Sequence, residues 1–464
     1  MLMAESLNSI SRGLGLGLGL GKLNFGSRNG VPLSSSFRLG KRGYKWKASL
    51  NLITNPDAFQ VGPFIGSYGF FNVTSYSGFE SGVDYEYLSE DIGKLKTQDV
   101  GEGGVNIRLY EGRITQGSLK GTSVLFKVYP GQRTGGAEAD MMAANELSTH
   151  TYLQSSSKEL CQNLLMLLGG FETNTGEQWL AFRYDGKYSA ADYAKIVSDK
   201  LTKNKIAESP SAWNPFEQGQ IFKRRRYFVI KMLQGISSGL AYMHEHDRLH
   251  QSLGPASVVL NTISEKEAAY MVARLRDLSF SVDISYSSLE KGPGTLSEGL
   301  WRRAIAAGAF NPIEKRNFGI ADDIYEAGLL FAYLAFVPFC ETGVMDSLSL
   351  QRLLENTFQL DIQAVREYCL ADDRLLEAVK FLDLGDGAGW ELLQVKRSLT
   401  FACYCHALSI RRVLPAAGQI IQFRDPNLSF ASVLERGAML NPDYRKRPVA
   451  TAVQSHRFVS GVLL

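Results

Sequence analysis

The chain has 464 residues, of which 45% are hydrophobic and 21% are charged, and its mean hydropathy is −0.10. These values are typical of globular material, enough for one large two-lobed domain or two to three small ones. The five cysteines are odd in number and widely scattered, which argues against a disulfide framework. No apolar run reaches the roughly 18–20 residues that a membrane-spanning helix needs.

The net charge of +3 is unevenly distributed along the chain. Residues 1–48 contain eight basic residues and one acid, a charge of +7, which leaves −4 for the remainder. A mildly acidic body offers no broad basic surface, so we expect no nucleic-acid partner.

Residues 1–50 are rich in Ser, Arg and Lys, a composition typical of an organellar transit peptide. The Gly-Leu repeat at 13–21 disfavours a helix, because each glycine costs about 1 kcal/mol relative to alanine. Mitochondrial presequences usually need an amphipathic basic helix, so we expect a chloroplast protein, in the stroma or associated with thylakoids. A disordered basic tail that stays on the protein is the alternative.

The next segments predict a strand-rich region. Residues 51–104, rich in Gly, Ser, Tyr and Phe, are interpreted as an irregular or β-rich N-terminal extension. The strands and the single helix expected after it are, in chain order, strands at 106–110, 114–119 and 122–129, a helix at 137–154, and strands at 164–172 and 178–184. Turns at Glu111-Gly112 and Lys120-Gly121 separate the first three strands.

The chain after Ser189 is mainly helical. Helices are expected at 190–203, 223–245, 322–336 and 348–381. Residues 395–430 fit no element and are left as an unplaced insertion. A strand-rich region followed by a helix-rich one predicts the α+β class rather than alternating βαβ units.

Short motifs carry the most specific information. The segment Leu125-Phe126-Lys127-Val128 places a lysine in an apolar strand, and Glu146 follows nineteen residues later within the predicted helix. The later segments, in chain order, are GLAYMH at 239–244, HQSLGPASVVL at 250–260, LRDLSF at 275–280, DIYEAG at 323–328 and LNPDYRKRP at 440–448.

In this order and near this spacing, the segments resemble the protein kinase superfamily. The resemblance implies a bilobal fold, with a small antiparallel β lobe at 105–185 and a larger helical lobe at 186–464. It also implies that Lys127 and Glu146 form the pair that holds the nucleotide phosphates, and that Asp277 holds Mg²⁺. His250, Asp323 and Arg447 match positions that are structural in the family, with Glu314 as a weak candidate partner of Arg447.

The chemical residues of the family's catalytic loop are replaced. Ser252 stands at the position of the catalytic base, Gln251 at that of the arginine, Gly254 at that of the lysine and Ser257 at that of the metal-binding asparagine. In the family's Gly-rich loop, Gly112 is the glycine that remains. Ile107 and Leu109 then take the other two glycine positions, where bulky side chains obstruct the approach to phosphates.

These departures predict negligible phosphoryl transfer, because a serine hydroxyl cannot accept the substrate proton near neutral pH. Lys127, Glu146 and Asp277 could still hold ATP with Mg²⁺. Alternatively, they persist as a structural ion-pair cluster without nucleotide. The expected function is a pseudokinase that serves as a binding or scaffold module for an unidentified plastid protein. An active atypical Ser/Thr protein kinase is the main alternative, and transfer of another group from ATP is a third.

Overall fold

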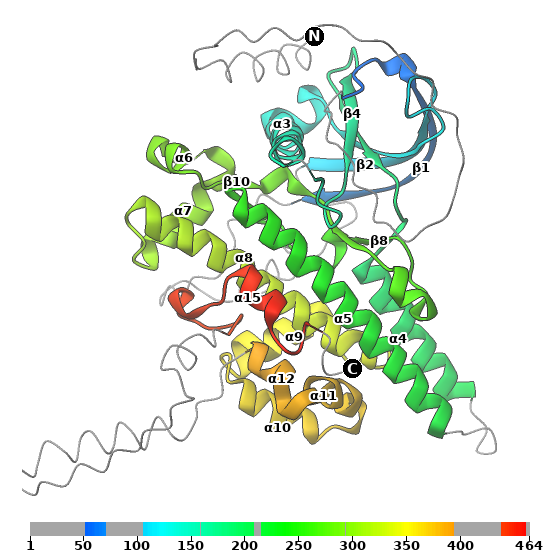
Figure 1. Ribbon diagram of the computed structural model, residues 1–464, viewed down its shortest axis with the longest axis vertical. Coiled ribbons are helices and arrows are strands. Elements are labelled where there is room, and N and C mark those ends of the chain that lie inside the picture. The colour runs from blue at the N-terminus through cyan, green and yellow to red at the C-terminus, as the bar shows by residue number, and fades with distance from the viewer. Residues whose placement is uncertain are drawn as a thin grey trace, which may run out of the picture.

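The structure, a computed structural model, describes residues 52–70, 105–157, 159–207, 215–292, 294–393 and 438–460. The predicted transit peptide and the unplaced segment at 395–430 lie outside these residues, as does most of the predicted extension at 51–104. A five-stranded antiparallel sheet is followed by many helices, which confirms the α+β class (Figure 1).

The main sheet is built from the N-terminal part of the described chain. Its strands are β1 (Phe59–Phe70), β2 (Val105–Ile114), β3 (Ser123–Tyr129), β4 (Leu167–Glu172) and β5 (Gln178–Arg183). They are ordered β1-β2-β3-β5-β4, and every neighbouring pair is antiparallel. The helix α3 (Gln132–Ser155) packs against one face of this sheet (Figure 1).

Successive side chains of β3 point to opposite faces of the sheet, as in any β-strand. Val124, Phe126 and Val128 join an apolar cluster on one face of the sheet. Tyr129 packs with α3 on the opposite face. Lys127 shares the parity of Tyr129, and this places its side chain beside α3.

Two predictions for this region were wrong. Residues 105–114 form one continuous strand, without the turn expected at Glu111-Gly112. Gly112 is a close-packing position, because a Cβ there would lie 2.3 Å from a Phe126 ring carbon and 2.7 Å from the Gln60 carbonyl oxygen. The strand expected at 114–119 is also absent, because the chain leaves the sheet after Ile114 and turns back through residues 115–122. Residues 59–70 of the predicted extension form β1 and pair with β2.

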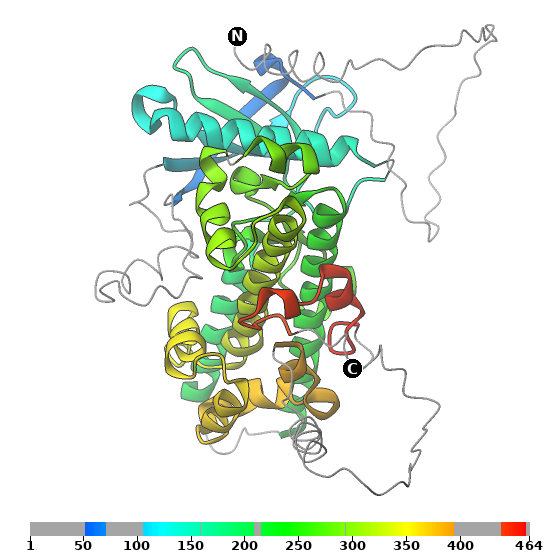
Figure 2. The ribbon, with the colours of Figure 1, turned by 90° about the vertical axis from the view of Figure 1, so that its left-hand side faces the viewer.

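The remaining helices form the larger part of the molecule. They are α4 (Ala190–Ala207), α5 (Pro215–Glu245), α6 (Tyr286–Lys291), α7 (Glu298–Ala306), α8 (Pro312–Phe336), α9 (Ser347–Gln351), α10 (Ile362–Leu370), α11 (Leu376–Leu382), α12 (Leu384–Leu393) and α15 (Ala450–Ser455). In Figure 2, α3 lies across the top of the molecule above the green and yellow helices. No helix within the described ranges is long and apolar enough to cross a membrane.

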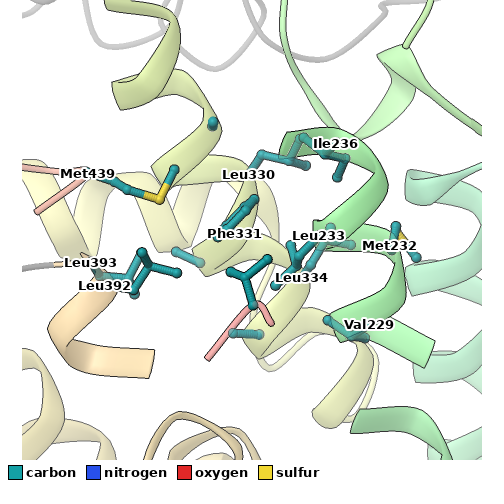
Figure 3. Packing of buried hydrophobic residues seen from close by; sticks show 14 of the residues in the cluster. Val229, Met232, Leu233, Ile236, Leu330, Phe331, Leu334, Leu392, Leu393 and Met439 are labelled. Atoms are coloured by element: carbon teal, nitrogen blue, oxygen red, sulfur yellow. The ribbon is translucent and has the colours of Figure 1, made fainter. Parts of the chain in front are cut away.

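The main core lies between α5 and α8. Figure 3 shows their facing side chains packed together with residues of α12 and the segment before α15, namely Val229, Met232, Leu233, Ile236, Leu330, Phe331, Leu334, Leu392, Leu393 and Met439. These side chains are buried. The core therefore fixes α5 and α8 relative to each other and supports the loops at their ends.

The single helix expected at 348–381 was wrong. The segment forms α9, a π-helical turn at Arg352–Thr357, α10 and α11. Gln359 and Leu360 have positive φ angles of 47° and 63°, and the carboxylate of Asp361 accepts a hydrogen bond from the Ala364 amide to cap α10. Because the apolar periodicity continues across this turn, the sequence pattern predicted one helix where the structure has several.

Two small sheets hold the loops beneath the main sheet. One joins β6 (Tyr188–Ser189), β8 (Val258–Leu260) and β9 (Ala273–Leu275), and the other pairs β7 (Arg248–Leu249) with β10 (Val282–Asp283). Because β7 and β8 flank the first loop and β9 and β10 flank the second, residues 250–257 and 276–281 lie side by side. The Arg276 amide also donates to the Ser257 carbonyl oxygen at 2.9 Å.

Candidate functional site

A buried ion cluster joins three segments that are far apart in the sequence. The Lys127 ammonium of β3 lies 2.6 Å from Glu146 Oε2 on α3 and 2.8 Å from Asp277 Oδ1 in the loop after β9. The three residues are 4%, 1% and 1% exposed, respectively. The structure thus brings together the lysine, the glutamate and the aspartate that the motifs singled out.

Backbone and side-chain bonds position the loop that carries Asp277. Asp277 has left-handed backbone angles, φ 67° and ψ 55°, which turn the chain into the short 3-10 helix Leu278–Phe280. The Asn145 amide on α3 donates to the carbonyl oxygens of Ser279 and Ser281 at 2.7 and 2.8 Å. These bonds dock the loop on α3, next to Glu146. An unfavourable backbone held by surrounding contacts is a feature that often marks a functional site.

Two tyrosines and an arginine complete the cluster. The Tyr68 hydroxyl of β1 donates to Asp277 Oδ1 at 2.8 Å, and the Tyr129 hydroxyl donates to Glu146 Oε2. The Arg276 Nε lies 3.3 Å from Asp277 Oδ2. Every carboxylate oxygen of Asp277 therefore faces at least one donor from the protein itself.

The charges of the cluster are complementary. Burial raises the pKa of Asp277, but the charges of Lys127 and Arg276 and the hydrogen bonds from Lys127 and Tyr68 outweigh it and bring the pKa to about 2. Burial and the charge of Asp277 raise the pKa of Tyr68 well above its usual value. Burial and Glu146 do the same for the pKa of Tyr129. At neutral pH the aspartate is thus ionised, and both phenols remain neutral donors.

His150 lies one helical turn beyond Glu146 and is fully enclosed. Burial, followed by the charge of Lys127, lowers the pKa of His150 to about 3. Its Nε2 lies 3.9 Å from Glu146 Oε1, but that carboxylate is already engaged by the ammonium of Lys127. The ring packs edge-on against Phe182 and is a neutral core residue at physiological pH.

Asp323 of α8 organises the loop at 250–257. Its carboxylate accepts hydrogen bonds from the amides of His250 and Gln251 at 2.7 and 3.0 Å, and lies 2.9 Å from the His244 ring. The side chain of Gln251, a residue with a positive φ of 58°, also donates to Asp323 at 3.0 Å. Although burial raises the pKa of Asp323, the bond and charge of His244 leave it lowered.

The His250 ring is buried between the two loops. Its Nε2 lies 3.1 Å from the Arg276 carbonyl oxygen, and burial lowers the pKa of this imidazole despite the charge of Asp323. His250 therefore links the loop at 250–257 to the loop that carries Asp277.

Ser252 and Ser257, which were expected at two catalytic-loop positions, form hydrogen bonds with the backbone. The Ser252 hydroxyl donates to the carbonyl oxygen of Asp277 at 2.6 Å. The buried Ser257 hydroxyl accepts from the Gly254 amide and donates to the Gly254 carbonyl oxygen, each at 2.9 Å. Ser257 thus closes its own turn, and both hydroxyls are committed to local structure.

Two other expectations fail. Gly112 lies inside β2 rather than in a phosphate-binding loop, between Val61 of β1 and Val124 of β3. Arg447 donates to the carbonyl oxygens of Asn441 and Ala321 at 2.7 and 3.0 Å. Glu314 instead caps the N-terminus of α8, so Arg447 and Glu314 do not form the expected pair within the part of the chain described.

Tyr68 was not among the predicted site residues, because β1 lies in the segment that was expected to be an N-terminal extension. Glycines and a proline interrupt the strand pattern at Gly62, Pro63 and Gly66, and the pairing of β1 with β2 is irregular at these residues. The alternation of apolar residues around these breaks was the available indication of a strand.

The donor set around Asp277 does not suit Mg²⁺ in this arrangement. A magnesium ion needs oxygen ligands with free lone pairs in near-octahedral geometry. Both Asp277 oxygens already face protein donors, and the Ser257 hydroxyl is turned into its own loop. This arrangement can hold opposite charges in a buried interior, but Asp277 has no carboxylate oxygen that is free of protein donors and able to bind a metal ion.

In comparisons with known proteins, no protein-family model matches the chain, and no curated protein matches it significantly.

Proposed function

We propose that this chain is a protein kinase-like protein without phosphoryl-transfer activity that acts as a binding or scaffold module in the chloroplast. The order of the motifs along 105–448 supports the family assignment. The antiparallel sheet with Lys127, followed by α3 with Glu146 and by a helical part, is the architecture that such a protein needs. The composition of residues 1–50 supports the location.

The main support for the proposal is the hydrogen bond made by the Ser252 hydroxyl. This residue stands where a transferase of this class keeps its proton acceptor, and its hydroxyl donates to the Asp277 carbonyl oxygen. A hydroxyl that already donates to a backbone carbonyl, with no basicity near pH 7, cannot take a proton from a substrate. A positioned general base contributes about 10²–10⁴ to the rate of such reactions.

The ion cluster supports the same conclusion. Lys127 is only 4% exposed and is held by two carboxylates. We infer that the cluster has become structural and that ATP with Mg²⁺ does not bind to the resting protein. A lysine in this setting stabilises the contact between the sheet, α3 and the loop at 276–281.

The test is a radiolabel transfer assay from ATP and Mg²⁺ to general protein substrates, with an active kinase as the positive control. The wild type is compared with Lys127→Ala, Asp277→Ala and the exposed control Lys380→Ala. We expect incorporation at background level in all four proteins. Incorporation by the wild type and the control that both site variants abolish would overturn the proposal in favour of an active atypical kinase.

A further inference from the structure

Tyr68 lies beside the two cations that pair with Asp277. Its hydroxyl donates to Asp277 Oδ1 at 2.8 Å. The centre of its ring lies 5.7 Å from the Lys127 ammonium and 5.9 Å from the Arg276 guanidinium. The tyrosine is 4% exposed, so its side chain fills this part of the site rather than lying over it.

These contacts replace those that a nucleotide would make. If the proposed function is right, Lys127 and Asp277 are the groups that would face phosphate oxygens and a metal ion. The phenol instead takes a lone pair of Asp277, and its aromatic face lies beside both cations. Because burial and Asp277 raise the pKa of Tyr68, the phenol remains a neutral donor.

Arg276 faces the second oxygen of Asp277, at a longer distance than Tyr68 faces the first. Its Nε lies 3.3 Å from Asp277 Oδ2, and it supplies beside this carboxylate the positive charge that a divalent ion would otherwise supply. The formal charges of Lys127 and Arg276 balance those of Glu146 and Asp277. The cluster is therefore electrostatically complete without a ligand.

The position of Tyr68 in an outer strand allows its side chain to be shortened by substitution without disrupting the sheet. β1 is an outer strand of the sheet and pairs with β2 alone among the five strands. Tyr68 lies opposite Ile107 in that pairing, near the C-terminal end of β1. A change at this position does not interrupt the pairs that hold Lys127 in β3.

We propose that Tyr68 is a built-in stopper of a nucleotide site. Its side chain keeps Mg²⁺-bound nucleoside diphosphates and triphosphates out, and shortening that side chain opens the site to them. This inference rests on the proposed function, because it takes Lys127 and Asp277 as remnants of a phosphate site. It adds the residue that decides whether the site accepts this class of ligand.

The experiment is a calorimetric titration of the full chain with ADP and Mg²⁺ at millimolar concentration. The proteins are the wild type, Tyr68→Ala, Tyr68→Phe and the control Tyr286→Ala, whose tyrosine is 55% exposed. We expect no binding by the wild type or the control, and saturable binding by Tyr68→Ala. Tyr68→Phe loses the bond to Asp277 but keeps the ring, so we expect detectable binding that is about tenfold or more weaker than that of Tyr68→Ala.

The outcomes separate the inference from the proposed function. If Tyr68→Ala does not fold, Tyr68→Phe decides, because it removes one oxygen and preserves the packing. A folded Tyr68→Phe that binds no more tightly than the wild type overturns the stopper, even when transfer is absent. Binding by the wild type as tight as that of the variants also overturns it. Phosphoryl transfer by the wild type would instead overturn the proposed function.

Discussion

Replacing Lys127 by methionine would remove the cation that lies between two buried carboxylates. Methionine keeps much of the length and apolar surface of the lysine stem, so the loss is mainly one of charge. Glu146 and Asp277 are each 1% exposed, and both would remain in a dry interior. In a nucleotide-binding enzyme with an open cleft, water could solvate these groups, whereas here both carboxylates are almost entirely buried.

The magnitude follows from the contacts. The ammonium makes bonds of 2.6 and 2.8 Å to the two carboxylates. Removing one partner of a buried ion pair costs about 3–5 kcal/mol, because the remaining charge is left without compensation. Arg276 and Tyr68 still contact Asp277. Glu146 keeps neutral donors, the Tyr129 hydroxyl and the Leu278 amide, but loses its cation, so Glu146 bears most of the loss. We therefore expect Lys127→Met to lower the free energy of unfolding by about 3–5 kcal/mol.

Urea denaturation followed by tryptophan fluorescence measures this change in the free energy of unfolding, provided that the m-value is the same for the compared proteins. The matched control is Lys380→Met, whose lysine is 60% exposed and lies 2.8 Å from Glu377. An exposed pair of this kind contributes at most about 1 kcal/mol. The double variant Lys127→Met/Glu146→Gln should recover about 1–3 kcal/mol relative to the single variant, because it neutralises the stranded charge.

A loss in Lys127→Met no larger than that in Lys380→Met would refute the reasoning. It would mean that water or another group compensates the carboxylates. Failure of the double variant to recover stability would likewise contradict the idea that an uncompensated charge causes the loss.

Two further predictions concern the sheet and α3. The pKa of His150 is about 3 when folded against 6.5 for a free imidazole, so unfolded chains bind more protons and stability is lost as the pH falls from 6.5 towards 3. Between pH 7 and pH 5 we expect a loss of about 2 kcal/mol that His150→Gln lacks, and equal urea midpoint shifts in both proteins would contradict this. Gly112→Ala places a Cβ 2.3 Å from the Phe126 ring, whereas no atom lies within 4 Å of a Cβ at Gly66. We expect Gly112→Ala to lose about 1–3 kcal/mol and Gly66→Ala at most about 0.5 kcal/mol in the same assay, and equal losses would show that packing at Gly112 is not the cause.

The parts of the fold that were predictable are those with local periodicity. The helix of α3 and the strands β3, β4 and β5 follow from runs of apolar residues between turn residues, and the structure confirms them to within a few residues. The closeness of Lys127 and Glu146 is also partly local, because the short link between β3 and α3 brings the two elements together.

What could not be predicted depends on contacts between distant segments. Asp277 lies 150 residues from Lys127, and only the order of the motifs suggested their proximity. Tyr68 lies 209 residues from Asp277, in a strand whose pattern is broken by glycine and proline. A glycine such as Gly112 looks like a turn residue in sequence, although the Phe126 ring beside it is what requires the absence of a side chain.

The most direct test of the account is a crystal structure of the wild-type protein grown with a non-hydrolysable ATP analogue and Mg²⁺. We expect the Tyr68 hydroxyl on Asp277, the Ser252 hydroxyl on the Asp277 carbonyl oxygen, and no nucleotide beside Lys127. An analogue bound there through two magnesium ions, with a carboxylate placed to take a proton from a substrate hydroxyl, would contradict the account.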